Sequence, residues 1–304
     1  MTHELEESTR GLRILYQLGD YTQVMQTERR KDPHTLIFDA IFYGNKNEVQ
    51  QLISGGVDKH VITHYPMRWE GASVLGAAAH EGHLDIVRYL VDIGTSVNFS
   101  DPCQGRTPLH WACLGNQYQV AAYLIKHGAD VNHADKEQTT PLLRAVITRN
   151  HDIVKLLIGN GADVHLVDIM CCSALHYACI HDDKKLISTV IRAGCISNNL
   201  ALVGKGTPLH TLYQQNDTTN ITLLLEAGYS LDNDRHWIKS VPTFATCSQS
   251  VRERVLQRAN QPMNLKHLCR KTVRNQLDGV NVEQRLERLK CPPLLQKYLA
   301  LDLL

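Results

Sequence analysis

The stretch Thr107-Pro108-Leu109-His110-Trp111-Ala112-Cys113 decides the fold of this chain, because near-copies of it recur at a fixed period. Further copies begin at Thr140, Ser173 and Thr207, which gives steps of 33, 33 and 34 residues. Weaker copies precede them at Thr35 and Ser73. A period of this length is the signature of architectures in which each structural unit packs mainly on its neighbours.

Local physical chemistry predicts two helices in every copy. Thr or Ser at the first position can cap the first helix, and Pro fits the next position because its missing N–H would be unpaired there anyway. A small residue such as Ala112 lets paired helices approach closely. The amphipathic second helix, for example residues 84–91, then ends at a glycine that can adopt a left-handed conformation. That glycine recurs at the same offset: Gly56, Gly94, Gly128, Gly161, Gly194 and Gly228.

This unit resembles the ankyrin repeat. The resemblance implies an all-α solenoid with short β-hairpin loops, and we count six repeats over residues 35–232. Residues 1–34 are expected to form an N-terminal helical cap. Residues 233–261 resemble a degenerate capping repeat that also serves as a linker.

The C-terminal region, residues 262–304, carries a second pattern. Leu265, Leu268, Cys269 and Val273 recur at steps of three and four residues, so they share one face of a helix. Leu265-x-x-x-Cys269-x-x-x-Val273 resembles the elongin-binding half of a SOCS box. Leu289-x-x-Pro292-x-x-Leu295-x-x-Tyr298-Leu299 resembles its cullin-selecting half. The pattern departs from the family at Lys290, where a first Pro is usual.

Together the two patterns resemble the ankyrin-repeat and SOCS-box family. The resemblance implies a non-catalytic substrate-recognition subunit of an elongin B/C–cullin-5 type E3 ubiquitin ligase, with a RING protein joining through the cullin. The implied elongin-binding residues are Leu265, Leu268, Cys269 and Val273. The implied cullin-binding residues are Leu289, Pro292, Leu295, Tyr298 and Leu299. An unidentified protein substrate would bind the repeats and be ubiquitinated and degraded.

The variable positions of the repeats are the candidates for substrate binding. Residues 64–71 lengthen one loop and carry an aromatic side chain, so they form a candidate binding finger. Aromatic and Arg side chains dominate interface hot spots, which favours those residue types. The candidates are Tyr43, Arg68, Trp69, Arg106, Leu114, Met170 and His181.

Composition narrows the class of protein. The 304 residues are 43% hydrophobic and 21% charged, as in soluble globular domains, and a formal net charge of +1 predicts attraction to neither nucleic acid nor membrane. Residues 1–7 lack the basic region and apolar core of a secretory signal, so we expect a cytoplasmic protein, with the nucleus as a second compartment. Nine cysteines without paired spacing predict reduced thiols.

No residue pattern predicts catalysis, a cofactor or a metal. We interpret His110, His176 and His210 as structural, with each imidazole bonded to neighbouring backbone. The Cys171-Cys172 pair lacks the spacing of a zinc site. Two other classes stay open: an ankyrin scaffold that sequesters a partner without ligase assembly, and an enzyme that carries ankyrin repeats.

Overall fold

The structure is a computed structural model that describes residues 33–63, 69–197, 200–201, 206–234, 237–238, 253 and 255–257. Within these residues the chain forms six pairs of α-helices. The first helices of the pairs are α2 (Pro33–Phe42), α4 (Val74–Glu81), α6 (Pro108–Leu114), α8 (Pro141–Ile147), α10 (Ala174–Ile180) and α12 (Pro208–Gln214). The second helices are α3 (Lys46–Ser54), α5 (Leu84–Asp92), α7 (Tyr118–Lys126), α9 (His151–Gly159), α11 (Lys184–Arg192) and α13 (Thr218–Glu226).

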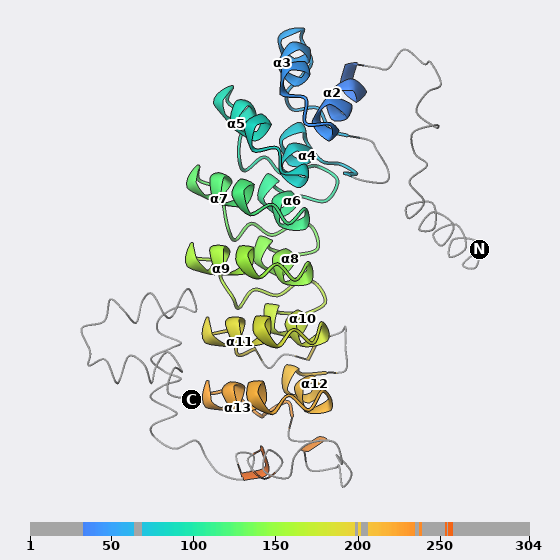
Figure 1. Cartoon of the computed structure of the whole chain (residues 1–304). Coiled ribbons are helices and arrows are strands. Elements are labelled where there is room, and N and C mark those ends of the chain that lie inside the picture. Colours follow the sequence, from blue (N-terminus) through green and yellow to red (C-terminus); the bar gives the residue numbers. More distant parts are fainter. Residues whose placement is uncertain are drawn as a thin grey trace, which may run out of the picture.

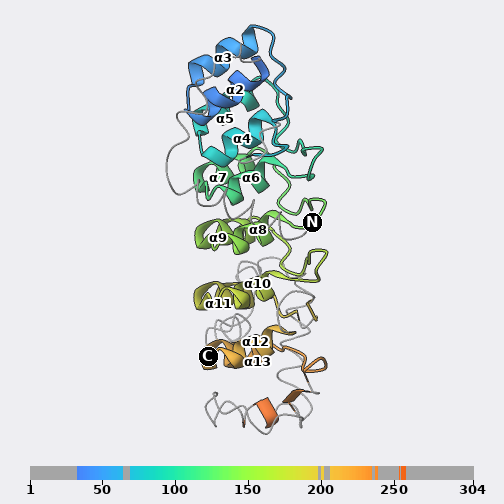
Figure 2. The same ribbon diagram turned by 90° about the vertical axis from the view of Figure 1, so that its right-hand side faces the viewer.

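The pairs stack in chain order into a solenoid. First helices form one column and second helices form the other, as Figures 1 and 2 show from two sides. Each first helix contacts the first helix of the next pair, from α2 through α12. The described loops contain one isolated antiparallel β-bridge, between Ile62 and Ser73, and no strand. The predicted all-α repeat solenoid is therefore confirmed.

The helix starts follow the capping chemistry read from the sequence. The hydroxyl of Thr140 accepts a hydrogen bond from the N–H of Leu143 at 3.3 Å, and Pro141 is the first residue of α8. Ser73, Thr107, Ser173 and Thr207 occupy the same position before α4, α6, α10 and α12. The first pair differs, because α2 begins at Pro33 and Thr35 lies inside it.

Small and branched side chains fill the space between the columns. Ala112, Ala145 and Ala178 are fully buried at equivalent positions of three first helices, as predicted for close helix approach. The core continues through each pair, so every repeat buries apolar surface against the next. The recurring glycines after the second helices have positive φ, between 84° and 106°, which favours glycine at these turns: Gly56, Gly94, Gly128, Gly161, Gly194 and Gly228.

The predicted boundaries 1–34, 35–232, 233–261 and 262–304 remain predictions, because most of the first, third and fourth segments lie outside the described residues. None of the helices in the described ranges reaches the length and apolar character that crossing a bilayer requires.

Candidate protein-binding surface

A row of side chains repeats at the C-terminal ends of the first helices. Each is the last or next-to-last residue of its helix: Phe42, His80, Leu114, Ile147, Ile180 and Gln214. We call Phe42, Leu114, Ile147 and Ile180 the apolar ladder. Phe42 is 38% exposed and Ile180 40% exposed, while the other two are half-buried. Packed helices lie about 8–10 Å apart, so Leu114, Ile147 and Ile180 offer apolar contacts at that interval. Because α4 carries His80 instead, Phe42 and Leu114 are two such steps apart.

Three of the predicted substrate-binding residues lie on or beside this ladder. Leu114 belongs to it, and Tyr43 and His181 directly follow Phe42 and Ile180. Tyr43 is 77% exposed, and its ring packs edge-on against Phe42 at 5.0 Å between centroids. The sequence search missed Ile147, although its register with Leu114 was available. That these residues contact a partner stays a prediction.

Trp69 corrects the sequence analysis. The predicted exposed anchor is only 3% exposed, and its ring lies 6.1 Å from that of Phe42. The indole N–H donates to Glu81 Oε1 at 3.0 Å and lies 3.2 Å from His80 Nδ1. Burial of a large ring with its N–H paired is favourable. The Trp69 side chain therefore packs beside Phe42 of the ladder and is not available to a partner.

Arg106, another predicted contact, forms part of a braced loop. Its guanidinium lies 5.3 Å above the Trp111 ring, and its Nε lies 3.6 Å from Asp135 Oδ2. Arg144 donates to the same carboxylate oxygen at 3.3 Å. Burial, and then the charge of Arg144, lowers the pKa of Arg106 from its ordinary value. The residue therefore stabilises the loop, whatever further contact it makes.

Asp135 belongs to a repeated brace that sequence reasoning did not identify. Its Oδ1 accepts hydrogen bonds from the backbone N–H groups of Glu137 and Thr139, at 2.9 and 2.8 Å. Oδ2 reaches the first helix through Arg144. The signal was present, since an Asp stands five or six residues before the caps Thr107, Thr140 and Ser173.

Asp101 and Asp168 repeat this geometry in the neighbouring loops. Asp101 accepts from the N–H of Gln104 at 2.6 Å, and Asp168 accepts from the N–H of Met170 at 2.9 Å. Their second oxygens bind the residue equivalent to Arg144, which is Trp111 in one case and Tyr177 in the other. All three aspartates are buried, so the loops are fixed relative to the first helices.

Met170 and His181 lie on the fifth repeat. Met170 is half-buried in the loop, where its neighbour Ile169 is 56% exposed and donates its N–H to Glu137 O at 3.1 Å. His181 caps the C-terminus of α10, and burial followed by the charge of Arg149 lowers its pKa. The Nε2 atom of His181 has no hydrogen-bond partner among the described atoms.

The structural interpretation of the repeat histidines is confirmed for His110. The Thr107 N–H donates to His110 Nδ1 at 3.2 Å, which leaves the proton on Nε2 to donate to Thr139 O at 3.0 Å. Burial lowers the pKa of His110 to about 4. His176 repeats the first contact, accepting from the Ser173 N–H at 3.1 Å. The His210 ring lies 4.9 Å from the ring of Trp237, and its Nε2 lies 3.3 Å from Gln214 Nε2.

The described cysteines divide by burial. Cys113, Cys172, Cys179 and Cys195 are buried. Burial raises the pKa of the thiols of Cys113, Cys179 and Cys195. Cys103 and Cys171 are exposed. Within the described ranges, His, Cys, Asp and Glu side chains form no group of three able to hold a metal ion.

Several predicted site residues lie outside the described residues. Arg68 is one of them. The elongin-binding candidates Leu265, Leu268, Cys269 and Val273 are others, as are the cullin-binding candidates Leu289, Pro292, Leu295, Tyr298 and Leu299.

Comparison with known families finds two matches along the chain. The model for ankyrin repeats (3 copies) matches residues 36–135, 104–168 and 142–235, which together span more than half of the chain. The model for the SOCS box matches residues 261–300.

Three individual relatives illustrate these matches. Putative palmitoyltransferase ZDHHC13 of Danio rerio is 28% identical over 201 residues, which cover 64% of this chain and 30% of the relative. Palmitoyltransferase ZDHHC17 of Homo sapiens is 33% identical over 197 residues, covering 64% of this chain and 30% of the relative. Ankyrin repeat and SOCS box protein 6 of Mus musculus is 37% identical over 81 residues, covering 26% of this chain and 19% of the relative. The chain spans less than a third of the length of each of these relatives.

Proposed function

Since the chain belongs to the ankyrin-repeat and SOCS-box family, we propose that it is the substrate-recognition subunit of a ubiquitin ligase that assembles with elongins B and C and a cullin. The observation that carries the proposal is the order of the two matches. A SOCS box match over residues 261–300 follows a run of repeats that ends at residue 235, with residues 236–260 between them. One chain thus combines a ligase-docking segment with a protein-binding surface.

We assign elongin binding to the apolar residues in the first half of the SOCS box. Leu265 would enter a pocket on elongin C, with Leu268, Cys269 and Val273 packed beside it. On a helix these four residues would share one face, so a single groove on the partner could cover them all.

The cullin contact falls to the second half of the box. The proposed partner is cullin-5, which would bring a RING protein. The residues proposed to contact it are Leu289, Pro292, Leu295, Tyr298 and Leu299. Lys290 replaces a Pro at the start of this segment, and a lysine leaves φ free where a Pro ring would fix it. The choice of cullin-5 therefore needs its own binding measurement, separate from the measurement of elongin binding.

The substrate contact falls to the apolar ladder. Phe42 and Ile180 supply exposed apolar surface at two points of the stack, and Tyr43 adds a largely exposed aromatic ring. The aspartate braces fix the loops beside these helices, so the surface is organised before a partner binds. Preorganisation of this kind reduces the conformational entropy lost on binding.

The chain itself would supply no catalytic group. It would hold a target lysine close to a ubiquitin-charged enzyme carried by the cullin and its RING partner. Holding two reactants together raises their effective concentration, and this is enough to direct the transfer.

The test is co-purification from cells that co-express the chain with elongins B and C. Burial of one Leu side chain stabilises a complex by roughly 1.5–3 kcal/mol, so Leu265→Ala alone should weaken elongin affinity by about one to two orders of magnitude. The double variant Leu265→Ala, Cys269→Phe should recover neither elongin, because the larger ring also obstructs the groove.

Ile180→Asp provides the matched control, because it changes the exposed ladder and leaves the SOCS box intact. This variant should retain both elongins and lose the substrates found by proximity labelling under proteasome inhibition. Full elongin recovery by the double SOCS-box variant would remove the ligase assignment and favour a sequestering scaffold.

A further inference from the structure

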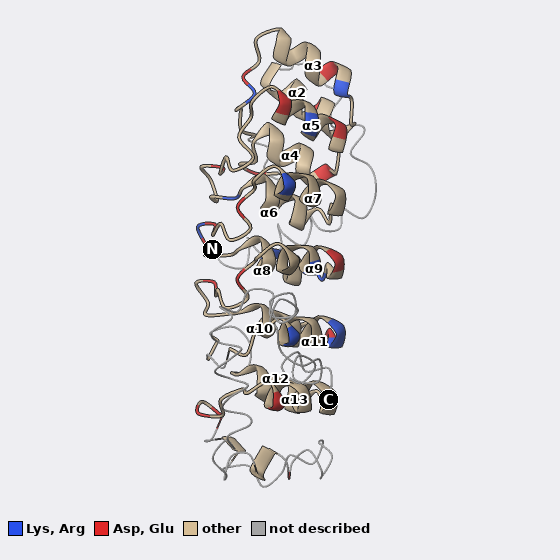
Figure 3. Cartoon of the chain, turned by 90° about the vertical axis from the view of Figure 1, so that its left-hand side faces the viewer, with Lys and Arg blue, Asp and Glu red and all other residues tan. Residues whose placement is uncertain are grey.

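The second helices of the middle repeats carry an unusual excess of positive charge. Helices α7, α9 and α11 contain Lys126, Lys155, Lys184, Lys185 and Arg192, against one carboxylate, Asp152. Helices α3, α5 and α13 on either side reverse the balance, with Glu48, Asp85, Asp92 and Glu226 against Lys46 and Arg88. Figure 3 views this column and shows blue on α11 and red on α13. We call Lys126, Lys155, Lys184 and Lys185 the basic patch.

The basic patch has carboxylates near it along the chain, Asp152 on α9 and Asp182 and Asp183 just before α11. All four lysines are exposed, and none forms an ion pair with a described residue. On a chain whose formal net charge is only +1, five cations against one carboxylate give these three helices an excess of positive charge.

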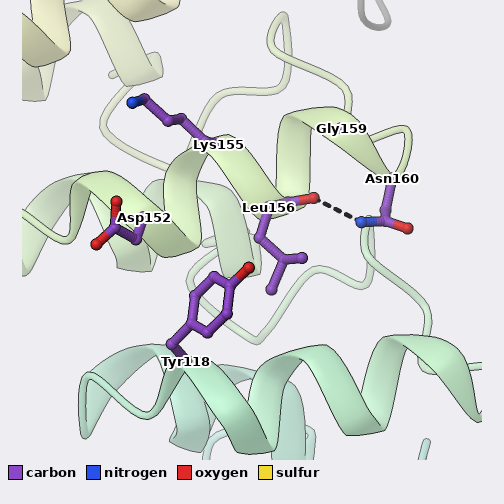
Figure 4. Close-up of a pocket in the computed structure, with 6 residues that line it drawn as sticks. All are labelled: Tyr118, Asp152, Lys155, Leu156, Gly159 and Asn160. Carbon is purple, nitrogen blue, oxygen red and sulfur yellow. Dashed lines mark hydrogen bonds between the residues drawn. The ribbon is translucent and has the colours of Figure 1, made fainter.

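A cleft opens between α7 and α9 within this region. It has a volume of about 450 Å³ and is lined by Tyr118, Asp152, Lys155, Leu156, Gly159 and Asn160. In Figure 4 the Tyr118 ring rises from α7 toward Leu156 on α9, with Asp152 and Lys155 on the same helix as Leu156. Tyr118 is 48% exposed. The cleft therefore combines apolar surface with charged groups.

Gly159 explains in part why the cleft lies at this repeat. It occupies the last turn of α9, where α7 has Lys126 and α11 has Arg192 at the equivalent position. Glycine within a helix costs about 1 kcal/mol relative to Ala. A long side chain is thus missing where the neighbouring second helices have one, and the space beside Leu156 stays open.

We propose that the cleft and the basic patch together bind an acidic segment of a partner protein. One apolar side chain of that segment enters between Tyr118 and Leu156, and its flanking carboxylates face Lys155 and Lys185. Three packed helices span about 16–20 Å, which an extended segment of roughly five to seven residues covers. Charge complementarity selects the acidic partner and accelerates its association.

The observations favour a peptide over a nucleic acid or a lipid surface. Asp152 is exposed at the edge of the cleft, where a peptide N–H can donate a hydrogen bond to its carboxylate. The acidic residues of α5 and α13 also limit the patch at both ends, so a long polyanion or a flat anionic bilayer would meet like charge there.

This surface lies on the second-helix column, whereas the apolar ladder lies on the first helices. The proposal therefore goes beyond substrate recognition, because it gives the repeats a second partner that can bind at the same time.

The test uses the full chain co-expressed with elongins B and C and a fluorescein-labelled peptide of glutamates around a central leucine. Fluorescence polarisation should detect binding that weakens as salt is raised, because the contact is between exposed charges. Lys155→Glu should weaken this binding at least about tenfold, and Lys155→Gln by a smaller factor. Lys46→Glu on α3 makes the same charge change outside the patch and should leave affinity within about twofold.

Two peptide controls separate the contributions. Replacement of the leucine by alanine should weaken binding to the wild type and leave binding to Tyr118→Ala unchanged. A peptide with lysines in place of glutamates should not bind.

The proposal is overturned if the acidic peptide fails to bind at about 1 mM, or if Lys155→Glu binds it as the wild type does. It is also overturned if Lys155→Glu leaves peptide binding unchanged and abolishes binding of the chain to RNA or to phosphatidylserine vesicles. Elongin recovery should be the same for all variants, so a failure here leaves the ligase assignment standing.

Discussion

Single aspartates determine how the loops of the repeats are attached. Asp168 uses one carboxylate oxygen for the backbone of its own loop, at the N–H groups of Met170 and Cys172, both at 2.9 Å. Its other oxygen accepts from the Tyr177 hydroxyl on α10. Because the group is buried, these contacts have no water to replace them. An unpaired buried donor costs about 1–3 kcal/mol, so loss of this one carboxylate should lower the free energy of unfolding substantially.

Asp168→Ala should lower the free energy of unfolding by about 2–3 kcal/mol, since it leaves two backbone N–H groups and a hydroxyl without partners. Asp168→Asn should cost distinctly less, because its amide oxygen can still accept the two backbone bonds. Urea denaturation followed by circular dichroism measures both variants. Equal losses for the two would mean that the negative charge, and not the hydrogen bonding, stabilises the loop.

His110 predicts a dependence of stability on pH. Its pKa falls from the ordinary 6.5 to about 4 in the folded chain because the ring is buried. The unfolded chain therefore binds the proton more readily between these pH values, and stability from this residue is complete above pH 6.5 and is lost as pH falls toward 4. One pKa unit corresponds to about 1.4 kcal/mol, so the loss is about 3 kcal/mol.

Comparison with His110→Gln isolates this effect from the other groups that titrate in acid. The variant should be less stable at pH 7 but show a flatter decline between pH 6.5 and 4 than the wild type. Parallel stability curves for the two proteins would show that His110 has no part in the acid sensitivity.

Sequence reasoning succeeded for residues whose role is local and failed where tertiary contacts decide. The role of His110 follows from its distance of three residues from Thr107, which a helix brings together. Trp69 stands in an unusual loop, and only its approach to Phe42 and Glu81 shows that it is buried. An aromatic residue in a loop serves equally as an anchor for a partner or as internal packing, and the sequence does not distinguish them.

At the scale of elements, the helices begin where a capping side chain replaces missing backbone hydrogen bonds. The first helices α6, α8, α10 and α12 are only seven residues long, so the unpaired N–H groups at their starts form a large share of their backbone. This explains why Thr or Ser precedes each of them. It also explains why the period was readable without knowledge of the fold.

Thr140→Ala should lower stability by about 1 kcal/mol, because it removes the acceptor for the Leu143 N–H at the start of α8. Thr140→Ser retains the hydroxyl and should stay within a few tenths of a kcal/mol of the wild type. Thermal unfolding of the three proteins distinguishes these outcomes. If serine is as damaging as alanine, the threonine methyl in the core is the stabilising group, and the cap is not.

At the scale of the whole molecule, the solenoid is a row of units with interfaces only between neighbours. First helices contact the next first helix. In the second column, α3 contacts α5, α5 contacts α7, α7 contacts α9, and α11 contacts α13. The sequence predicts this order because the period is constant, but it does not predict which faces become binding surfaces. The apolar ladder and the basic patch emerge only when equivalent positions from successive repeats are placed side by side.

A nearest-neighbour architecture predicts that damage spreads according to position. Ile41→Ala in α2 and Leu142→Ala in α8 each remove a fully buried side chain, at a cost of about 2–5 kcal/mol. The α2–α3 pair begins the described stack, so the first change should accelerate hydrogen exchange mainly within residues 33–54. The second change lies between α6 and α10, and it should accelerate exchange in the pairs on both sides. Hydrogen exchange followed by mass spectrometry resolves these regions. A uniform acceleration through all six pairs for Ile41→Ala would mean that the repeats unfold as one unit, and the description by neighbouring interfaces would then be wrong.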